Sequence, residues 1–159
     1  DAAGGTAAAP AAAGTGAETA TPAAAPSAGA GGGEQADYQA ALDLLKNGRY
    51  DQAIAAFSRF IAAYPQSEFA DNAQYWIGET HYVNRDFTAA LKAFQAVVDV
   101  YGQSRKLPDA MLKIGYCDDE LHRPEEARRV LGEVVAKFPG TSAATLAAER
   151  LKKMRSEAH

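Results

Sequence analysis

The chain has 159 residues, a formal net charge of −4 and 47% hydrophobic residues. Nucleic-acid-binding domains usually carry a basic face, so this mildly acidic balance argues against that class of protein. No apolar run approaches the length of a membrane span, and the single cysteine, Cys117, excludes an internal disulfide.

Residues 1–33 differ in composition from the rest of the chain. They consist of Ala, Gly, Thr, Pro and Ser apart from Asp1 and Glu18. Such a segment buries too little apolar surface to offset the entropy of ordering it, and its prolines and glycines interrupt every alanine-rich stretch. We therefore predict a linker over 1–33 and a folded domain over 34–159. Because the chain opens on Asp1 inside this linker, we expect it to be a processed or excised piece.

The folded part begins with apolar residues at spacings of three and four, which are typical of amphipathic helices. The residues from Tyr38 to Leu45 predict a helix over 35–47, and a second stripe predicts a helix over 50–64 that Pro65 stops. Two antiparallel helices joined by a short turn form one unit.

The same pattern continues to the end of the chain. It predicts further helices over 69–83 and 87–101, then 108–121 and 124–138, and a last helix over 142–155. Ser67, Ser104 and Thr141 precede three of these helices at equal spacing, so we predict that they act as N-caps.

The helix pairs recur at an interval of 37 residues. Ala53, Ala90 and Ala127 fall in register, and small residues at Gly78 and Gly115 favour close approach of neighbouring helices. A fixed period of this length is typical of repeat proteins, whose units are stabilised by stacking on one another. The residues expected at the packed contacts are Ala53, Phe57, Gly78, Ala90, Phe94, Gly115, Ala127 and Leu131.

Small residues in register, with a helix-ending Gly or Pro in each unit, resemble the tetratricopeptide repeat, a helix-turn-helix of 34 residues. The resemblance implies an all-α, tetratricopeptide-like superhelix of three helix pairs plus a C-terminal capping helix. The units would cover about 34–66, 71–103 and 108–140, and the capping helix about 142–155. Lys152 and Lys153 give this last helix the polar face that a solenoid end needs.

Residues 73–79 (AQYWIGE) and 110–117 (AMLKIGYC) also resemble one bacterial family. This is the YbgF family, also called CpoB, the cell-division coordinators of the Tol-Pal system. The resemblance implies a periplasmic protein that binds TolA and helps to couple the peptidoglycan synthesis machinery to outer-membrane constriction. Family members begin with a signal peptide and a trimerising coiled coil, so residues 1–33 would be the tether that follows, and trimerisation would need the missing coiled coil. An accessory factor of outer-membrane lipoprotein or protein assembly is the alternative, because such factors use similar repeats.

No pattern in the chain indicates catalysis. A phosphate loop, a nucleophile elbow and zinc-ligand spacing are all absent from the sequence, and isolated side chains do not make a site. We therefore predict a non-enzymatic protein with no metal and no cofactor. Cys117 is expected to be a buried thiol, His81 to pack in a repeat core and His122 to face water, while Asp118 and His122 alone are too few ligands for a metal.

The first helix of each pair is expected to line the inner wall of the superhelix. The predicted partner-binding residues are Tyr38, Leu42, Leu45, Tyr75, Glu79, Tyr82, Leu112, Tyr116 and Asp119. This aromatic wall with acidic spots suits a helix carrying aliphatic side chains and lysines, such as the Ala/Lys-rich region of TolA that the resemblance implies. Lys, Arg and Asn are absent from these positions, which argues against capture of an acidic peptide end. For Tyr38, Tyr75 and Trp76, burial between units is an open alternative.

Overall fold

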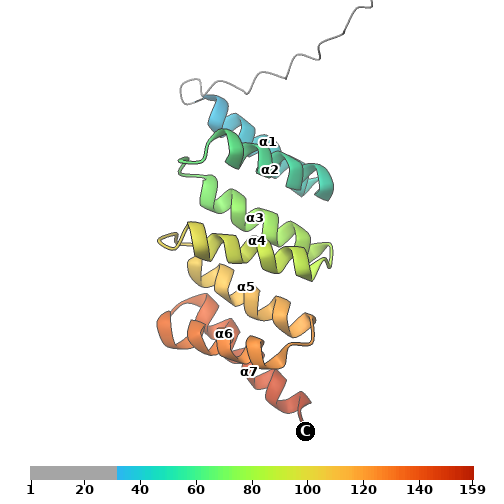
Figure 1. The fold of residues 1–159 in the computed structure, drawn as a ribbon, viewed down its shortest axis with the longest axis vertical. Helices are drawn as coiled ribbons and strands as arrows, with labels where there is room; N and C mark the ends of the chain where they lie inside the picture. The colour runs from blue at the N-terminus through green and yellow to red at the C-terminus, as the bar shows by residue number, and fades with distance from the viewer. Residues whose placement is uncertain (1–31) are drawn as a thin grey trace, which may run out of the picture.

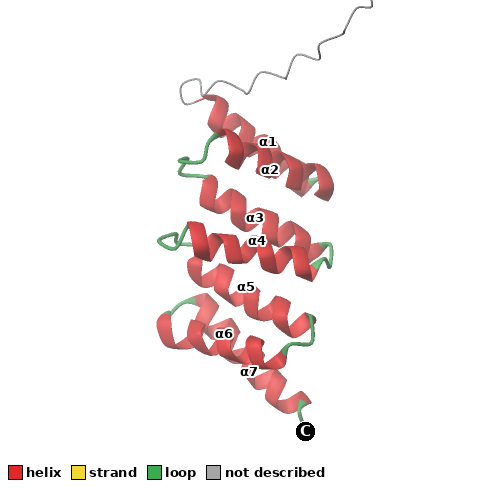
Figure 2. Ribbon diagram, viewed as in Figure 1, coloured by secondary structure: helices red, strands yellow, loops and turns green. Residues whose placement is uncertain are grey.

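The computed structural model describes residues 32–159, and nearly all of the predicted linker lies outside them. Seven helices and no strand are present in this described range. The helices stack in chain order along the long axis of the molecule (Figure 1), and short loops join them (Figure 2). Their bounds are α1 (Gly32–Lys46), α2 (Tyr50–Ala63), α3 (Ala70–Val83), α4 (Phe87–Val100), α5 (Leu107–Glu120), α6 (Pro124–Lys137) and α7 (Ser142–Glu157). The predicted all-α repeat of three helix pairs and a final helix is therefore confirmed.

The largest difference from the predicted bounds is at the start of α1. This helix begins at Gly32, inside the predicted linker, although glycine has low helix propensity. Glu34 lies in its first turn, where a carboxylate interacts favourably with the positive end of the helix dipole. At the other end, α7 continues two residues beyond the predicted 155, to Glu157.

Of the three predicted N-caps, one is confirmed and two are wrong. Thr141 Oγ1 accepts a hydrogen bond from the Ala144 backbone N–H at 3.1 Å and caps α7 as predicted. Ser67 Oγ and Ser104 Oγ accept from the N–H groups of Phe69 and Lys106, at 3.0 Å each, before α3 and α5 have begun. These two serines therefore stabilise the connecting turns instead of capping helices, because serine also bonds readily to the backbone two residues on.

All eight residues expected at the packed contacts lie in the interior. Ala53, Ala90 and Ala127 have no solvent exposure, and neither have Phe57, Phe94 and Leu131. At Gly78 an added Cβ would lie 2.5 Å from the Phe94 ring, and at Gly115 it would lie 2.5 Å from a Leu131 methyl. Each glycine thus admits the bulky residue of the following helix to close contact.

Successive pairs share their cores. Ile77 and Ala93 of the second pair (α3–α4) are buried in the core of the first pair (α1–α2). Ile114 and Val130 of the third pair (α5–α6) are buried in the core of the second. Leu131 and Val134 of α6 pack in turn with Ala143 and Ala147 of α7. Each pair is therefore stabilised by its neighbour, as expected for a solenoid.

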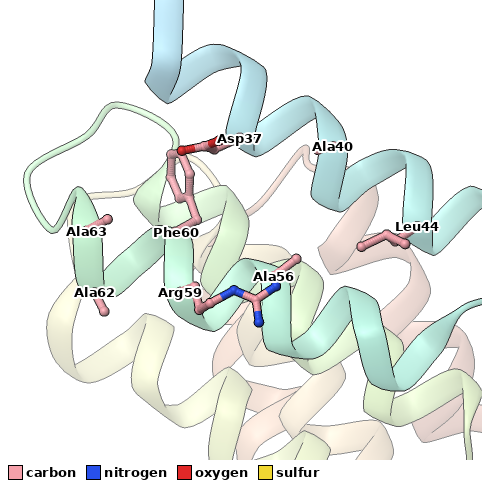
Figure 3. Close-up of a pocket in the computed structure, with 8 residues that line it drawn as sticks. All are labelled: Asp37, Ala40, Leu44, Ala56, Arg59, Phe60, Ala62 and Ala63. Atoms are coloured by element: carbon pink, nitrogen blue, oxygen red, sulfur yellow. The ribbon is translucent and has the colours of Figure 1, made fainter. Parts of the chain in front are cut away.

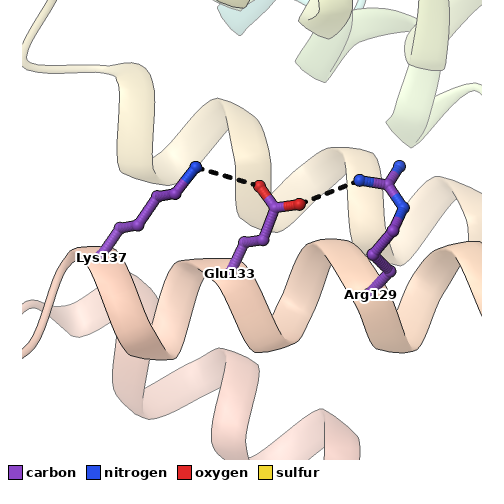
Figure 4. A network of polar contacts seen from close by, with 3 residues as sticks. All are labelled: Arg129, Glu133 and Lys137. Carbon is purple, nitrogen blue, oxygen red and sulfur yellow. Dashed lines mark hydrogen bonds and ion pairs between the residues drawn. The ribbon is translucent and has the colours of Figure 1, made fainter.

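The outer surface of α6 carries a short row of ion pairs (Figure 4). Glu133 lies between Arg129, at 2.9 Å, and Lys137, at 3.3 Å, each four residues away along the helix. Because Arg129 and Lys137 are exposed and Glu133 is only partly buried, each pair contributes only about 0.3–0.5 kcal/mol. The row favours the helix locally but does not determine the fold.

Candidate protein-binding wall

One wall of the stack gathers aromatic and charged side chains from α3, α5 and α7. We call it the α3–α5–α7 wall and define it as Glu79, Tyr82, Lys113, Tyr116, Asp119 and Arg150. All six side chains are partly exposed. Lys113 and Arg150 stand 37 residues apart, so both come from the same repeat position and reach back toward the preceding pair.

Lys113 joins the second pair to the third. Its Nζ lies 3.1 Å from Glu79 Oε1, which is shielded from solvent, although the two atoms lack hydrogen-bond alignment. The same ammonium lies 4.5 Å from the centre of the Tyr82 ring and 5.7 Å from that of Tyr116. Both distances are within the range of cation–π attraction.

Arg150 joins the third pair to α7. Its Nη1 donates a hydrogen bond to Asp119 Oδ2 at 2.8 Å, and its Cζ lies 4.1 Å above the Tyr116 ring. The pKa values of Tyr82 and Tyr116 are raised, because burial outweighs the opposing effect of the nearby Arg150. Both phenols therefore remain neutral donors and acceptors at physiological pH.

The resulting column alternates ring and cation in the order Tyr82, Lys113, Tyr116, Arg150. Its two carboxylates, Glu79 and Asp119, each face one of the two cations, so the defined wall has no formal net charge. The two expected acidic positions, Glu79 and Asp119, are thus each paired with a cation from the next unit. The sequence reading missed Lys113 and Arg150 because it followed only positions one turn apart; their shared register was the signal that would have found them.

Two predicted partner-binding residues lie in the core instead. Tyr75 is 9% exposed and Leu112 is 3% exposed. Tyr75 packs on Phe94 with ring centres 5.5 Å apart, and Leu112 packs in the cluster that contains Leu131. Both are corrected to core residues, because this repeat position faces the partner helix of its own pair.

The three predicted partner-binding residues of the first pair, Tyr38, Leu42 and Leu45, are partly buried against the first core. The Tyr38 ring stacks on Phe69 at 4.9 Å, and its hydroxyl accepts a hydrogen bond from Trp76 Nε1 at 3.1 Å. These contacts between pairs occupy much of the Tyr38 and Trp76 surface.

The residues considered for catalysis differ in their exposure. Cys117 has no solvent exposure, and burial raises the pKa of its thiol to about 12. His81 is half-buried, with Nδ1 4.0 Å from Asp86 Oδ2, and His122 is exposed. Asp118 is buried beside Arg123, with Oδ1 and Nη1 3.9 Å apart. Over residues 32–159, no three His, Cys, Asp or Glu side chains come together in a way that could hold a metal ion.

None of the described helices combines the length and the apolar character needed to span a bilayer.

Stacked helix pairs that share their cores define the class of helical-repeat solenoid proteins. Models described as tetratricopeptide repeat match residues 38–110 and 109–141, which together cover most of the described residues. The chain belongs to the tetratricopeptide-repeat family.

Curated relatives confirm the more specific resemblance. The cell division coordinator CpoB of Pseudomonas putida is 45% identical over 53 residues, which are 33% of this chain. CpoB of Escherichia coli strain K12 is 42% identical over 52 residues, which are 32% of this chain. Each match spans 20% of the relative's own length.

Solved structures share the fold at low identity. The first tetratricopeptide domain of Spaghetti (RPAP3), solved with an HSP90 peptide, has a TM-score of 0.63 at 18% identity; the match covers 79% of this chain and 92% of that one. A Podosopora anserina protein of nearly identical TPR-like repeats has a TM-score of 0.57 at 14% identity and covers 77% and 73%. These likenesses establish the architecture alone.

Proposed function

We propose that this chain is the non-enzymatic repeat domain of a CpoB-type protein of the periplasmic Tol-Pal system. It binds TolA and coordinates peptidoglycan synthesis with outer-membrane constriction during cell division. The support is the similarity to two proteins named as cell division coordinators, joined to a fold whose relatives include a peptide-bound domain. The observation that carries the proposal is the α3–α5–α7 wall, which offers partly exposed rings beside paired charges.

The wall suits a helical segment with aliphatic and basic side chains. The partner's aliphatic side chains pack on Tyr82 and Tyr116, since rigid rings supply contact area at small entropic cost. A lysine of the partner competes with Lys113 for Glu79, or with Arg150 for Asp119. Because one cation replaces another, this exchange contributes orientation and specificity more than affinity.

Calorimetric titration of the chain with a purified TolA helical segment tests the proposal. Tyr82→Ala removes a wall ring and should weaken binding at least tenfold, equivalent to about 1.4 kcal/mol. Tyr50→Ala is the matched control, because Tyr50 is also partly exposed but lies at the start of α2, outside the wall. Absence of binding by the folded chain, or equal losses in the two variants, would count against the wall.

Lys113→Met distinguishes which charge the partner brings. It keeps an apolar side chain at the site but frees Glu79, so a lysine-bearing segment should bind more tightly than it binds the unaltered chain. Salt should weaken this added attraction, because screening acts on exposed charges. Weaker binding by Lys113→Met would instead indicate that the partner presents a carboxylate to Lys113.

A further inference from the structure

The N-terminal end of the stack carries an apolar hollow away from the α3–α5–α7 wall. Ala40 and Leu44 of α1 line it together with Ala56 and Ala63 of α2, and its volume is about 530 Å³ (Figure 3). Asp37 and Arg59 are the charged residues of the lining. We call this site the end-face hollow.

The repeat register identifies what kind of surface this is. The positions 37 residues after Ala40 and Ala56 are Ile77 and Ala93, which are buried in the core of the first pair. A further 37 residues on, Ile114 and Val130 are buried in the core of the second pair. The end-face hollow is therefore the face that contacts a preceding pair elsewhere in the stack, and nothing within residues 32–159 covers it in the first pair.

The covering element has the same pattern each time. On the second pair it is α2, with Phe57, Phe60 and Tyr64 in the shared core. On the third pair it is α4, with Phe94, Val97 and Tyr101. Both helices present bulky apolar residues at positions i, i+3 and i+7, which form one stripe of a helix.

The chain itself has no unused stripe of this kind in its sequence or described structure. Residues 1–31 contain no large apolar residue at all. A second copy offers none either, because Phe57 and Phe94, the first members of the α2 and α4 stripes, have no solvent exposure. At the opposite end, α7 exposes Glu149, Lys152 and Lys153, and Leu146 is its single exposed large apolar residue within the described range, so α7 offers no apolar stripe.

We propose that the end-face hollow is a docking site for an amphipathic helix of a partner protein, with bulky apolar residues at i, i+3 and i+7. The partner helix occupies the place that α2 and α4 take on the later pairs. Its apolar stripe packs in the hollow, as in helix-in-groove recognition. Ala40 and Ala56 are smaller than Ile114 and Val130 at the same repeat positions, so the hollow has room for side chains at least as large as Phe94. This site is independent of the wall and of the function proposed for it.

A peptide that carries the apolar stripe of α4 tests the docking site in the intact chain. The probe is a synthetic peptide of residues 85–101, end-blocked and stapled between positions 88 and 92, which are exposed in α4 and lie off the stripe. In an NMR titration of the isotope-labelled chain to about 1 mM peptide, saturable shifts should appear at Ala40, Leu44, Ala56 and Ala63. The same peptide with Phe94→Asp and Val97→Asp should produce none.

Two variants of the chain complete the test. Ala40→Asp places a charge in the hollow and should weaken peptide binding at least tenfold. Ala36→Asp changes an exposed alanine one turn earlier, outside the hollow, and should change binding less than twofold. The proposal is overturned by absence of saturable shifts, by shifts confined to other faces, or by equal effects of the two variants. It is also overturned if the chain without peptide dimerises in sedimentation and Ala40→Asp abolishes the dimer, since a second copy would then be the occupant.

Discussion

At the turn inside each helix pair, one residue adopts a left-handed backbone conformation. Gly48 has φ of 73°, Arg85 has 61° and His122 has 59°, and the three are spaced by 37 residues. Only the first is glycine, the residue that adopts this region without strain. The spacing and Gly48 indicated a turn, but nothing at Arg85 or His122 revealed the conformation, because the stacked helices impose it on whatever residue stands there.

We predict that His122→Gly raises the free energy of unfolding by about 0.5–1 kcal/mol. Relief of the left-handed strain exceeds the entropy that glycine adds to the unfolded chain. Arg85→Gly should raise the free energy of unfolding by less, because it also removes the guanidinium that lies 5.4 Å from the Phe87 ring centre. Urea denaturation of both variants measures this, with Gly48→Ala as the reverse change, expected to cost about 1 kcal/mol. If the His122→Gly variant is less stable than the unaltered chain, the left-handed conformation does not strain His122.

Helical spacing predicts only part of the α3–α5–α7 wall. Tyr82, Tyr116 and Asp119 could be placed from spacing alone, because positions one helical turn apart share a face. Whether Tyr75 faced a groove or the core depended on how its own pair packs, which spacing cannot specify. Lys113 and Arg150 reach the wall through long side chains extending between units, and such contacts depend on the distance between stacked pairs.

At the scale of the helices, periodicity and helix-stop residues located all seven elements. The predicted starts and ends agree with the structure to within about two residues, apart from the start of α1, because prolines, glycines and strong apolar stripes mark the boundaries. The helix contacts were also predictable in part: a glycine at fixed register opposite a bulky residue indicates close approach. The serines before α3 and α5 were misplaced because cap residues and turn residues have the same chemistry.

Two helix glycines that differ only in surroundings test the packing. Gly115→Ala places a methyl 2.5 Å from Leu131 and should lower the free energy of unfolding by about 1–3 kcal/mol through overpacking. Gly132→Ala, in α6, meets nothing within 4 Å and should raise it by about 0.5–1 kcal/mol through better helix propensity. Thermal and urea unfolding of the two variants provide the comparison. Similar effects of both substitutions would mean that the α5–α6 contact is looser than described.

At the scale of the whole molecule, the solenoid has two different ends. The α7 end exposes charged residues, whereas the α1–α2 end exposes the apolar hollow. Between them, each core includes residues of the next pair or of α7, so stability is shared along the stack through nearest-neighbour contacts. The 37-residue register predicted this sharing, and Lys152 and Lys153 predicted the polar end. The apolar end is identified by the buried equivalents of Ala40 and Ala56.

Cys117 offers a reporter for opening of the stack. Its thiol is buried in the core shared by the second and third pairs, and its pKa of about 12 leaves almost no thiolate at neutral pH. A disulfide reagent should therefore react only as fast as the stack opens, with a rate that urea increases. Because the folded pKa lies above the value near 8.5 of an unfolded thiol, burial of the neutral form favours folding at neutral pH. That contribution declines as pH rises from about 8.5 toward 12; rapid reaction of the native chain at pH 7 would contradict the burial.

An NMR map of the labelled chain bound to the TolA helical segment tests most directly whether the α3–α5–α7 wall binds the partner. We expect the largest shifts at Glu79, Tyr82, Lys113, Tyr116, Asp119 and Arg150, and no shifts in the ion-pair row of α6. Saturable binding that leaves these six residues unperturbed and shifts another face would contradict the assignment of the α3–α5–α7 wall as the partner-binding surface.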